Sequence, residues 1–292
     1  MMAEEQTIYR SLFGKEMILE LYDETVRELG VDFEDVVIDT RFGQTHAIVT
    51  GPNEAPPVIA LHGGNEYTPN TLRNVISFCN QFRVFAVDII GHPGKSAETR
   101  LSMNDYSYGE WLLDVLDGLN LDSARVFCGS YSASIALRLA AISPRRIDKL
   151  ALVSPSGLAN GSLVAILRKL FIPWMIYRVF PNRTRLQKSI SPIISDPDEN
   201  LLRFLEASLK YLRIRVPTPR LVTVEELSSF EAPTMVFCQS EDILYPPKKV
   251  IPRANEVFRN LTSIECLEGV HSPTREQFDH ISRKVFEFFK SH

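Results

Sequence analysis

Residues 125–144 read RVFCGSYSASIALRLAAISP, and this stretch decides the fold. An apolar run of strand type leads directly into Gly129 and Ser130, and a segment rich in Ala, Leu and Ile follows and ends before Pro144. The succession of strand, sharp turn and helix is typical of a parallel sheet, whose strands need a crossover between them. The stretch therefore predicts an α/β fold with Ser130 at the turn that follows a buried strand.

The same alternation continues on both sides of this stretch. Apolar runs of four to six residues, separated by helical stretches, indicate parallel strands that are buried on both faces. An amphipathic helix over 4–29 and two strand-like runs at 36–40 and 46–50 come first and suggest an antiparallel start to the sheet. Further strands are expected at 58–61, 83–88, 125–129, 149–154, 234–239 and 262–267, and further helices at 69–81, 106–120, 131–143, 247–258 and 273–290.

The alternation stops between residues 157 and 226. Several Pro residues divide helical stretches there, and the sequence contains no convincing strand. We interpret residues 157–226 as a helical cap that is inserted into a core domain of residues 1–156 and 227–292.

The most apolar part of the predicted cap is LVAILRKLFIPWMIYRVF at 163–180. Arg168, Lys169 and Arg178 interrupt it, and such charges oppose a membrane-spanning helix. We therefore expect no stable membrane insertion and favour a helical lid over a pocket, with a membrane-surface patch as the alternative.

Ser130 is the candidate nucleophile. A nucleophile elbow requires small residues two before and two after the nucleophile, because the strand and helix backbones nearly touch there. Cys128 and Ser132 hold these two positions, which are usually Gly, so the motif GxSxG is not literally present. Ser132 offers a rival frame, but it would leave two surplus residues in a turn that has to be tight. The register therefore favours Ser130.

A serine hydroxyl needs a base that takes its proton and an acid that orients the base. His271, on the loop GVHSP after the last expected strand, is the candidate base, whereas His92 is expected to brace a turn. Asp242 follows the strand at 234–239 by three residues and is the candidate acid, with Glu241 beside it as the alternative. Loops at the carboxyl edge of such a sheet lie close together. The chain order Ser, acid, His is the one expected for this type of fold.

The loop HGGN at 62–65 is the candidate oxyanion loop. Glycines there let backbone N–H groups approach a substrate without an intervening Cβ. We assign the donors to the N–H groups of Gly64 and Tyr131. A phosphate-binding loop is the rival, but HGGN lacks the spacings GxGxxG and GxxxxGK[ST]. The other three residues of the loop are expected to contact substrate: His62, Gly63 and Asn65.

The predicted cap supplies further candidates for substrate contact. Trp174 is assigned to substrate binding, and its apolar neighbours either line an acyl pocket or form the packing core of the cap. Residues 163–220 carry 11 Lys and Arg against 4 Asp and Glu. One hypothesis is that one or two of these cations steer an anionic substrate, and the alternative is a solvated outer face.

Composition disfavours several classes of protein and site. The 32 Lys and Arg against 36 Asp and Glu give a net charge of -4, which provides no general attraction to nucleic acid. The four Cys residues are scattered and lack the spacing of a zinc site or a disulfide scaffold, so we expect buried, reduced thiols and no metal. The acidic N-terminus differs from a signal peptide and predicts a cytoplasmic protein.

The motifs LHGG, VDIIGHPGKS, VFCGSYS, APTMVFCQSEDILYPP and GVHS occur in the order found in the α/β-hydrolase superfamily, which the chain resembles along nearly its whole length. The stretch IDTRFGQTHAIVTGPNEAPPVIALHG is similar to the opening of bacterial carboxylesterases related to naproxen esterase, and the elbow is similar to that of prolyl iminopeptidases. The resemblance implies an eight-stranded, mostly parallel sheet with helices on both faces and an inserted helical cap. It also implies a triad of Ser130, Asp242 and His271, and no cofactor.

These residues predict a serine hydrolase that cleaves a small-molecule carboxylic ester through an acyl-enzyme on Ser130. The nearest enzymatic rival is an aminopeptidase similar to prolyl iminopeptidases. It needs acidic cap residues to hold a substrate ammonium group, and the basic cap disfavours it. The rival from another class is a non-catalytic, ligand-binding relative, which the altered elbow leaves open. The oligomeric state is not indicated by the sequence.

Overall fold

The computed structural model describes residues 7–214 and 218–291, and its centre is an eight-stranded sheet. The strands are β1 (Glu34–Thr40), β2 (Gly43–Thr50), β3 (Pro57–Leu61), β4 (Arg83–Val87), β5 (Ala124–Gly129), β6 (Ile147–Val153), β7 (Thr234–Gln239) and β8 (Leu261–Leu267). Their order in the sheet is β1-β2-β4-β3-β5-β6-β7-β8. The β1–β2 and β2–β4 pairs are antiparallel and all other pairs are parallel, which confirms the predicted sheet.

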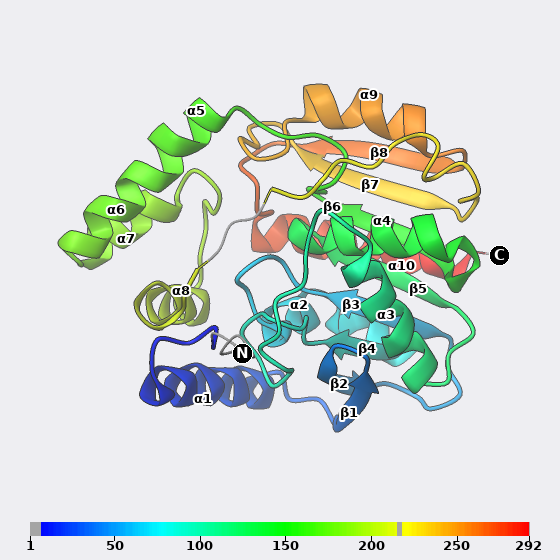
Figure 1. The fold of residues 1–292 in the computed structure, drawn as a ribbon, viewed down its shortest axis with the longest axis horizontal. Helices are drawn as coiled ribbons and strands as arrows, with labels where there is room; N and C mark the ends of the chain where they lie inside the picture. Colours follow the sequence, from blue (N-terminus) through cyan, green and yellow to red (C-terminus); the bar gives the residue numbers. More distant parts are fainter. Residues whose placement is uncertain (1–6, 215–217, 292) are drawn as a thin grey trace, which may run out of the picture.

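Successive residues of the strands face two separate apolar layers. In β3, for example, Ile59 and Leu61 pack in one layer, whereas Val58 and Ala60 pack in the other. Both faces of the sheet are therefore buried, which explains the continuous apolar runs in the sequence. Helices α3 (Ser107–Gly118), α4 (Tyr131–Ile142) and α9 (Pro247–Val257) cover the first face, and α1 (Leu12–Glu28), α2 (Thr68–Asn74) and α10 (Arg275–Lys290) cover the second (Figure 1).

Some predicted elements differ in their bounds. The leading helix α1 begins at Leu12, because the hydroxyl of Ser11 accepts the Gly14 N–H and caps the helix. Residues 4–6 of the predicted helix lie outside the described residues. The predicted helix at 69–81 is divided at Val75 into α2 and a 3-10 helix, η1 (Ile76–Asn80), and another 3-10 helix, η2 (Pro144–Arg146), follows α4. Two cysteines differ from the expected burial, since Cys79 is half-buried and Cys266 is exposed.

Between β6 and β7, the described residues form helices with no strand of the sheet. They are α5 (Leu163–Ile166), a π-helical turn η3 (Leu167–Phe171), α6 (Ile172–Val179), α7 (Arg183–Ile190) and α8 (Glu199–Tyr211). The two ends of the predicted cap pack with the core and not with the cap helices, since Leu158 and Val222 belong to the apolar layer under α4. The division into core and cap stays a prediction. The helices of the predicted cap occupy residues 163–211. Arg215 and Pro217 of the predicted cap lie outside the described residues.

Helix α8 attaches these helices to the core. The ring of Phe204 stacks on Tyr67 with centroids 3.8 Å apart and planes inclined by 3°. On α1, Gly14 permits the close approach of Tyr211, because a Cβ at this glycine would lie 2.7 Å from the Tyr211 Cβ. Helices α5 and α6, in contrast, project away from the sheet (Figure 1). In the ranges 7–214 and 218–291, no helix combines the length and the apolar character needed to cross a membrane.

Candidate active site

Ser130 lies at the sharp turn between β5 and α4. Its φ of 53° and ψ of −123° are unfavourable for a residue that carries a Cβ. Two backbone hydrogen bonds hold the turn: the Ser130 N–H donates to the Val153 carbonyl (2.9 Å), and the Ser156 N–H donates to the Ser130 carbonyl (3.1 Å). The strained turn presents the Ser130 hydroxyl at the carboxyl edge of the sheet.

The two residues that replace the usual glycines of the elbow are both buried. Cys128 packs in the apolar layer under α4. The Ser132 hydroxyl lies 2.9 Å from the Gly129 carbonyl and 3.1 Å from the Leu61 carbonyl, and it accepts the Gly129 N–H at 3.2 Å. Ser132 is thus fully buried and bonded to backbone, which leaves Ser130 as the serine of the elbow that faces the imidazole.

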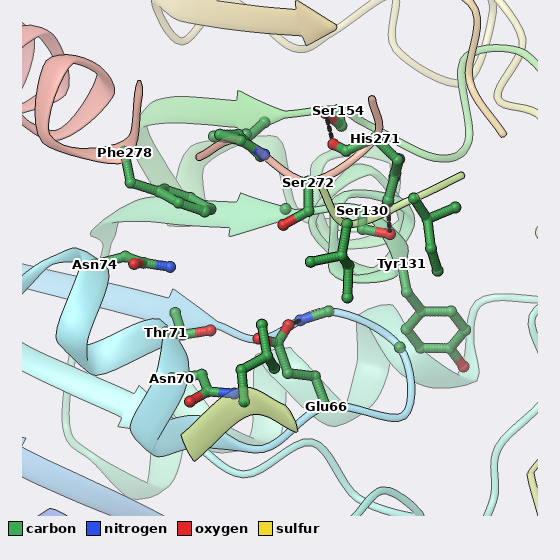
Figure 2. A pocket seen from close by; sticks show the side chains of 18 of the residues that line it. Glu66, Asn70, Thr71, Asn74, Ser130, Tyr131, Ser154, His271, Ser272 and Phe278 are labelled. Carbon is green, nitrogen blue, oxygen red and sulfur yellow. Dashed lines mark hydrogen bonds between the residues drawn. The ribbon is translucent and has the colours of Figure 1, made fainter. Parts of the chain in front are cut away.

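The structure brings Ser130, His271 and Asp242 into one line. His271 Nε2 lies 2.8 Å from the Ser130 Oγ (Figure 2), and His271 Nδ1 lies 2.8 Å from the Asp242 Oδ2. Since a carboxylate only accepts hydrogen bonds, Nδ1 carries the proton and Nε2 is free to accept one from the serine. The arrangement can therefore activate a hydroxyl nucleophile.

Backbone groups fix the acid and the base of this line. The Oδ1 of Asp242 accepts the N–H groups of Leu244 at 2.7 Å and of Tyr245 at 3.0 Å. The Ser154 hydroxyl donates to the His271 carbonyl at 2.7 Å. Asp242 is buried while its neighbour Glu241 is exposed, so the alternative acid points away from the imidazole.

The predicted oxyanion donors lie beside the nucleophile. Gly64 approaches Tyr131 so closely that a Cβ on the glycine would lie 3.1 Å from the Tyr131 Cβ. Tyr131 is the first residue of α4, where N–H groups have no partner within the helix. The neighbouring N–H groups of the loop are occupied: Gly63 donates to Glu66 (3.1 Å) and Asn65 donates to His92 (3.2 Å).

Two histidines fix the oxyanion loop. His62, assigned to substrate contact from the sequence, does not line the cavity, and that assignment is corrected: its Nε2 accepts the Ile89 N–H (3.1 Å) and its Nδ1 donates to the Gly63 carbonyl (2.8 Å). His92 accepts the Asn65 N–H, so it braces a turn, as predicted. Burial lowers the pKa of both imidazoles, which keeps them neutral.

A cavity of about 440 Å³ opens at Ser130. Gly63 and Asn65 line it, whereas Trp174, the predicted contact in the cap, does not, and this assignment is corrected. The Trp174 ring packs against Phe171 with centroids 5.4 Å apart, and Leu170 of the π-helical turn reaches the cavity instead. Leu170 alone lines the cavity among the apolar cap residues that were expected either to line an acyl pocket or to pack the cap, namely Leu163, Ile166, Leu170, Phe171, Trp174 and Met175.

None of the described Lys and Arg residues of the predicted cap lines this cavity. The charged residues that the cap contributes are Asp196 and Asp198, and Asp198 pairs with Arg73 of α2 at 2.7 Å. The hypothesis that cap cations steer a substrate therefore has no support from the cavity wall. The cations lie elsewhere on the cap.

Glu66 is a cavity residue that the sequence reasoning missed. It directly follows HGGN, and the signal available was an acid next to an assigned oxyanion loop. Its Oε2 accepts the Gly63 N–H at 3.1 Å, and burial raises the pKa of the carboxyl. A carboxyl at this place can act on the oxyanion loop and on the charge that develops on His271.

Helix α2 gives the cavity a polar side. Figure 2 shows Asn70, Thr71 and Asn74 across the cavity from Ser272 and Phe278. The Nδ2 of Asn70 is buried and has no hydrogen bond within 3.5 Å in the described part of the chain, although the Asn70 amide lies close enough to the Glu66 carboxyl to favour its charged form. Since an unmet buried donor costs free energy, this atom is suited to a substrate oxygen or a water molecule.

The described residues contain no group of three or more His, Cys, Asp and Glu side chains that could hold a metal ion.

Comparisons with known proteins agree with this fold. Residues 56–175 match the alpha/beta hydrolase fold family. The carboxylesterase nap of Bacillus subtilis strain 168 is 26% identical over 285 residues, which cover 92% of this chain and 91% of nap. Carboxylesterase YbfK of the same strain is 25% identical over 282 residues, which cover 91% of each protein.

Two solved structures share the fold. Carboxylesterase CesB (YbfK) from Bacillus subtilis has a TM-score of 0.82 at 24% identity, with 96% of this chain and 99% of that chain covered. Naproxen esterase (carboxylesterase NP) from the same organism has a TM-score of 0.79 at 24% identity, with 95% and 98% covered. The chain thus has the α/β-hydrolase fold and is similar to bacterial carboxylesterases related to naproxen esterase.

Proposed function

We propose that this protein hydrolyses a carboxylic ester through an acyl-enzyme on Ser130. The observation that carries the proposal is the unbroken line from Asp242 through His271 to Ser130, with two contacts of 2.8 Å. Similarity to two carboxylesterases over nine tenths of the chain supports the same class of substrate.

In the first half of the proposed reaction, the Ser130 Oγ attacks the ester carbonyl carbon while His271 Nε2 takes the hydroxyl proton. The N–H groups of Gly64 and Tyr131 stabilise the negative charge on the former carbonyl oxygen. The C–O bond to the alcohol then breaks, and His271 returns the proton to the departing oxygen. The alcohol leaves, and the acyl group remains on Ser130.

In the second half, water takes the place of the alcohol. His271 accepts a proton from the water, which attacks the acyl carbonyl carbon, and the bond to the Ser130 Oγ breaks. His271 then returns the proton to the serine. Asp242 holds the imidazole in the required tautomer and favours its cationic form at both steps.

The cavity limits the size and polarity of the substrate. Its volume of about 440 Å³ suits a small molecule, and its apolar residues include Leu170, Leu205 and Phe278. The polar side on α2 suits a substrate that carries an oxygen acceptor near its ester group. We propose a small ester with one polar substituent as the preferred class.

A fluorophosphonate probe tests the assignment of the nucleophile. Wild type and Ser132→Ala should be labelled, whereas Ser130→Ala should not, because the probe reacts with an activated serine hydroxyl. Absence of labelling in the wild type would favour the non-catalytic, ligand-binding relative. A panel of p-nitrophenyl esters of increasing chain length then measures the acyl preference.

An aminopeptidase is the second candidate, because Glu66 and Asp196 place carboxyl groups at the cavity that could hold a substrate ammonium. The Glu66 carboxyl is already bonded to the Gly63 N–H, and burial disfavours its charged form. Amino-acid p-nitroanilides should therefore be poorer substrates than p-nitrophenyl esters. A higher kcat/KM for the anilides would reverse this preference.

A further inference from the structure

The outer side of the cap carries an apolar face that no described residue covers. Along α5, η3 and α6, six large apolar side chains that are 39% to 65% exposed recur mostly at spacings of three or four. We call these residues the outer apolar face: Val164, Leu167, Phe171, Met175, Ile176 and Val179. Their number on one helical surface distinguishes them from singly exposed apolar residues, which are common on proteins.

The opposite side of the same segment faces the protein. Leu170 lines the cavity, and Tyr177 is buried in a small apolar cluster with Leu186 and Leu202. The segment is therefore apolar on two sides, one of which is used for packing. Internal packing does not explain the other.

Cations accompany the outer apolar face. Arg168 and Lys169 lie within the segment, and they form no ion pair with any carboxylate in the described part of the chain. Arg178 lies over the Trp174 ring at 5.9 Å, and it also forms no ion pair with a carboxylate of the described residues. This positive region occurs on a chain whose net charge is -4.

We propose that the outer apolar face docks onto the surface of an anionic phospholipid bilayer. Apolar side chains on one helical face enter the boundary between headgroups and acyl chains, and flanking Lys and Arg contact the lipid phosphates. No helix of the described chain can span a membrane, so attachment of this kind would be peripheral and reversible. Leu170 lines the cavity from the opposite side of the same segment, so the cavity would lie about one helix diameter from the lipid surface.

Charge favours a lipid surface over a second copy of this chain. A symmetric dimer buries the same face of both copies against each other. Such a contact would bring Arg168, Lys169 and Arg178 of one copy close to those of the other, with no acid in the segment to neutralise them. An anionic bilayer neutralises the same charges.

Co-sedimentation with unilamellar vesicles tests this docking. The full chain should pellet with vesicles that contain phosphatidylglycerol, less with phosphatidylcholine alone, and less again in roughly 1 M salt, where the screening length is about 3 Å. Leu167→Glu with Ile176→Glu should lower the partition coefficient at least about tenfold, because two charges enter the apolar face. Arg168→Gln with Lys169→Gln should lower it about tenfold on anionic vesicles only.

Matched controls separate docking from net charge, folding and catalysis. Leu12→Glu with Val37→Glu adds the same charge at two apolar residues that are 81% and 61% exposed elsewhere, and it should bind almost as wild type does. Ser130→Ala should bind unchanged, because docking needs no catalysis. All variants of the outer apolar face should retain wild-type activity on a soluble p-nitrophenyl ester, which shows that they fold.

Two results would overturn the proposal. One is equal sedimentation of the wild type and the Leu167→Glu, Ile176→Glu variant, or no sedimentation of either. The other is a concentration-dependent dimer in analytical ultracentrifugation that this variant dissociates, without vesicle binding by the wild type. The second result would identify another copy of the chain as the occupant of the face.

Discussion

Two buried histidines make the same contact with an aspartate. His271 Nδ1 lies 2.8 Å from Asp242, and His46 Nδ1 lies 2.9 Å from Asp88. Both aspartates are almost completely buried, and both follow a strand of the sheet. A search for His and Asp pairs alone would rank the two sites equally.

The other ring nitrogen distinguishes the two histidines. His271 Nε2 meets the Ser130 hydroxyl at 2.8 Å, whereas His46 Nε2 meets Asp35 at 2.6 Å. A hydroxyl partner leaves the Nε2 atom free to accept a proton. A second carboxylate instead favours a proton that stays on Nε2. The third partner therefore decides whether a buried His and Asp pair can act as a base or as a fixed cation.

The largest expected effects come from removing each imidazole in turn. His271→Gln should lower kcat/KM for a p-nitrophenyl ester by about 100,000-fold, because no base remains for Ser130. His46→Gln should leave kcat/KM within about twofold but lower the free energy of unfolding by about 2–3 kcal/mol, because Asp88 loses a buried partner. Steady-state kinetics and urea unfolding measure the two quantities. A large loss of activity in a folded His46→Gln protein would contradict the distinction.

Replacing the acid of the catalytic line should have the next largest effect. Asp242→Asn should lower kcat by about 10,000-fold, because an amide no longer requires the tautomer with the proton on Nδ1. Glu241→Gln is the matched control, since this exposed neighbour points away from the imidazole, and it should leave kcat unchanged. If Asp242→Asn kept its activity and Glu241→Gln lost it, Glu241 would be the acid instead of Asp242.

The sequence predicted the catalytic line because each of its residues follows a strand. Ser130, Asp242 and His271 lie on loops after β5, β7 and β8, and loops at this edge of a parallel sheet converge whatever their side chains are. Cys128 and Ser132, which replace the usual glycines of the elbow, leave the position of Ser130 unchanged. Cys128 packs in the core, and Ser132 bonds to backbone.

The side chains of the cavity were less predictable, because they depend on local turns. The π-helical turn at Leu167–Phe171 changes the phase of the helix, so Leu170 rather than Trp174 reaches the cavity. The orientation of Glu66 depends on Asn65, whose φ of 54° no motif at this position predicts. His62 belongs to the assigned loop, but its ring turns inward to bond to backbone.

Glu66 provides an intermediate case between the two histidines, because its carboxyl faces the catalytic imidazole without a direct bond to it. Burial raises the pKa of the Glu66 carboxyl, so its negative charge is fully present only above the usual range of a carboxyl, and Glu66→Gln should lower activity most at high pH. At pH 8 the variant should be about tenfold slower, because the imidazolium that forms during the reaction loses a favourable charge. An equal loss of activity at pH 6 and pH 8 would show that Glu66 only supports the oxyanion loop, and Glu66→Asp tests whether a carboxylate on a shorter side chain suffices.

The smallest expected effect concerns Asp35, the carboxylate that contacts the Nε2 of His46. Burial opposes the charged imidazole, but the hydrogen bonds and charges of Asp88 and Asp35 prevail, and the pKa of His46 is raised. A raised imidazole pKa stabilises the folded state below its unfolded value of about 6.5, and the contribution is lost as pH rises through the folded value. Asp35→Asn should therefore lower the free energy of unfolding by about 0.5–1 kcal/mol near pH 6 and by less near pH 9, since Asp35 is half exposed and screened.

The Lys95 ammonium lies 3.6 Å from Asp35, so part of the effect of Asp35→Asn should persist at high pH. Asp39→Asn on the same strand is the control for a change of net charge, and it should show no such dependence on pH. Urea unfolding of the three proteins at several pH values measures the differences. If the penalty for Asp35→Asn grew as the pH rose, His46 would be neutral in the folded protein, and the two histidines would differ only in whether a serine is present.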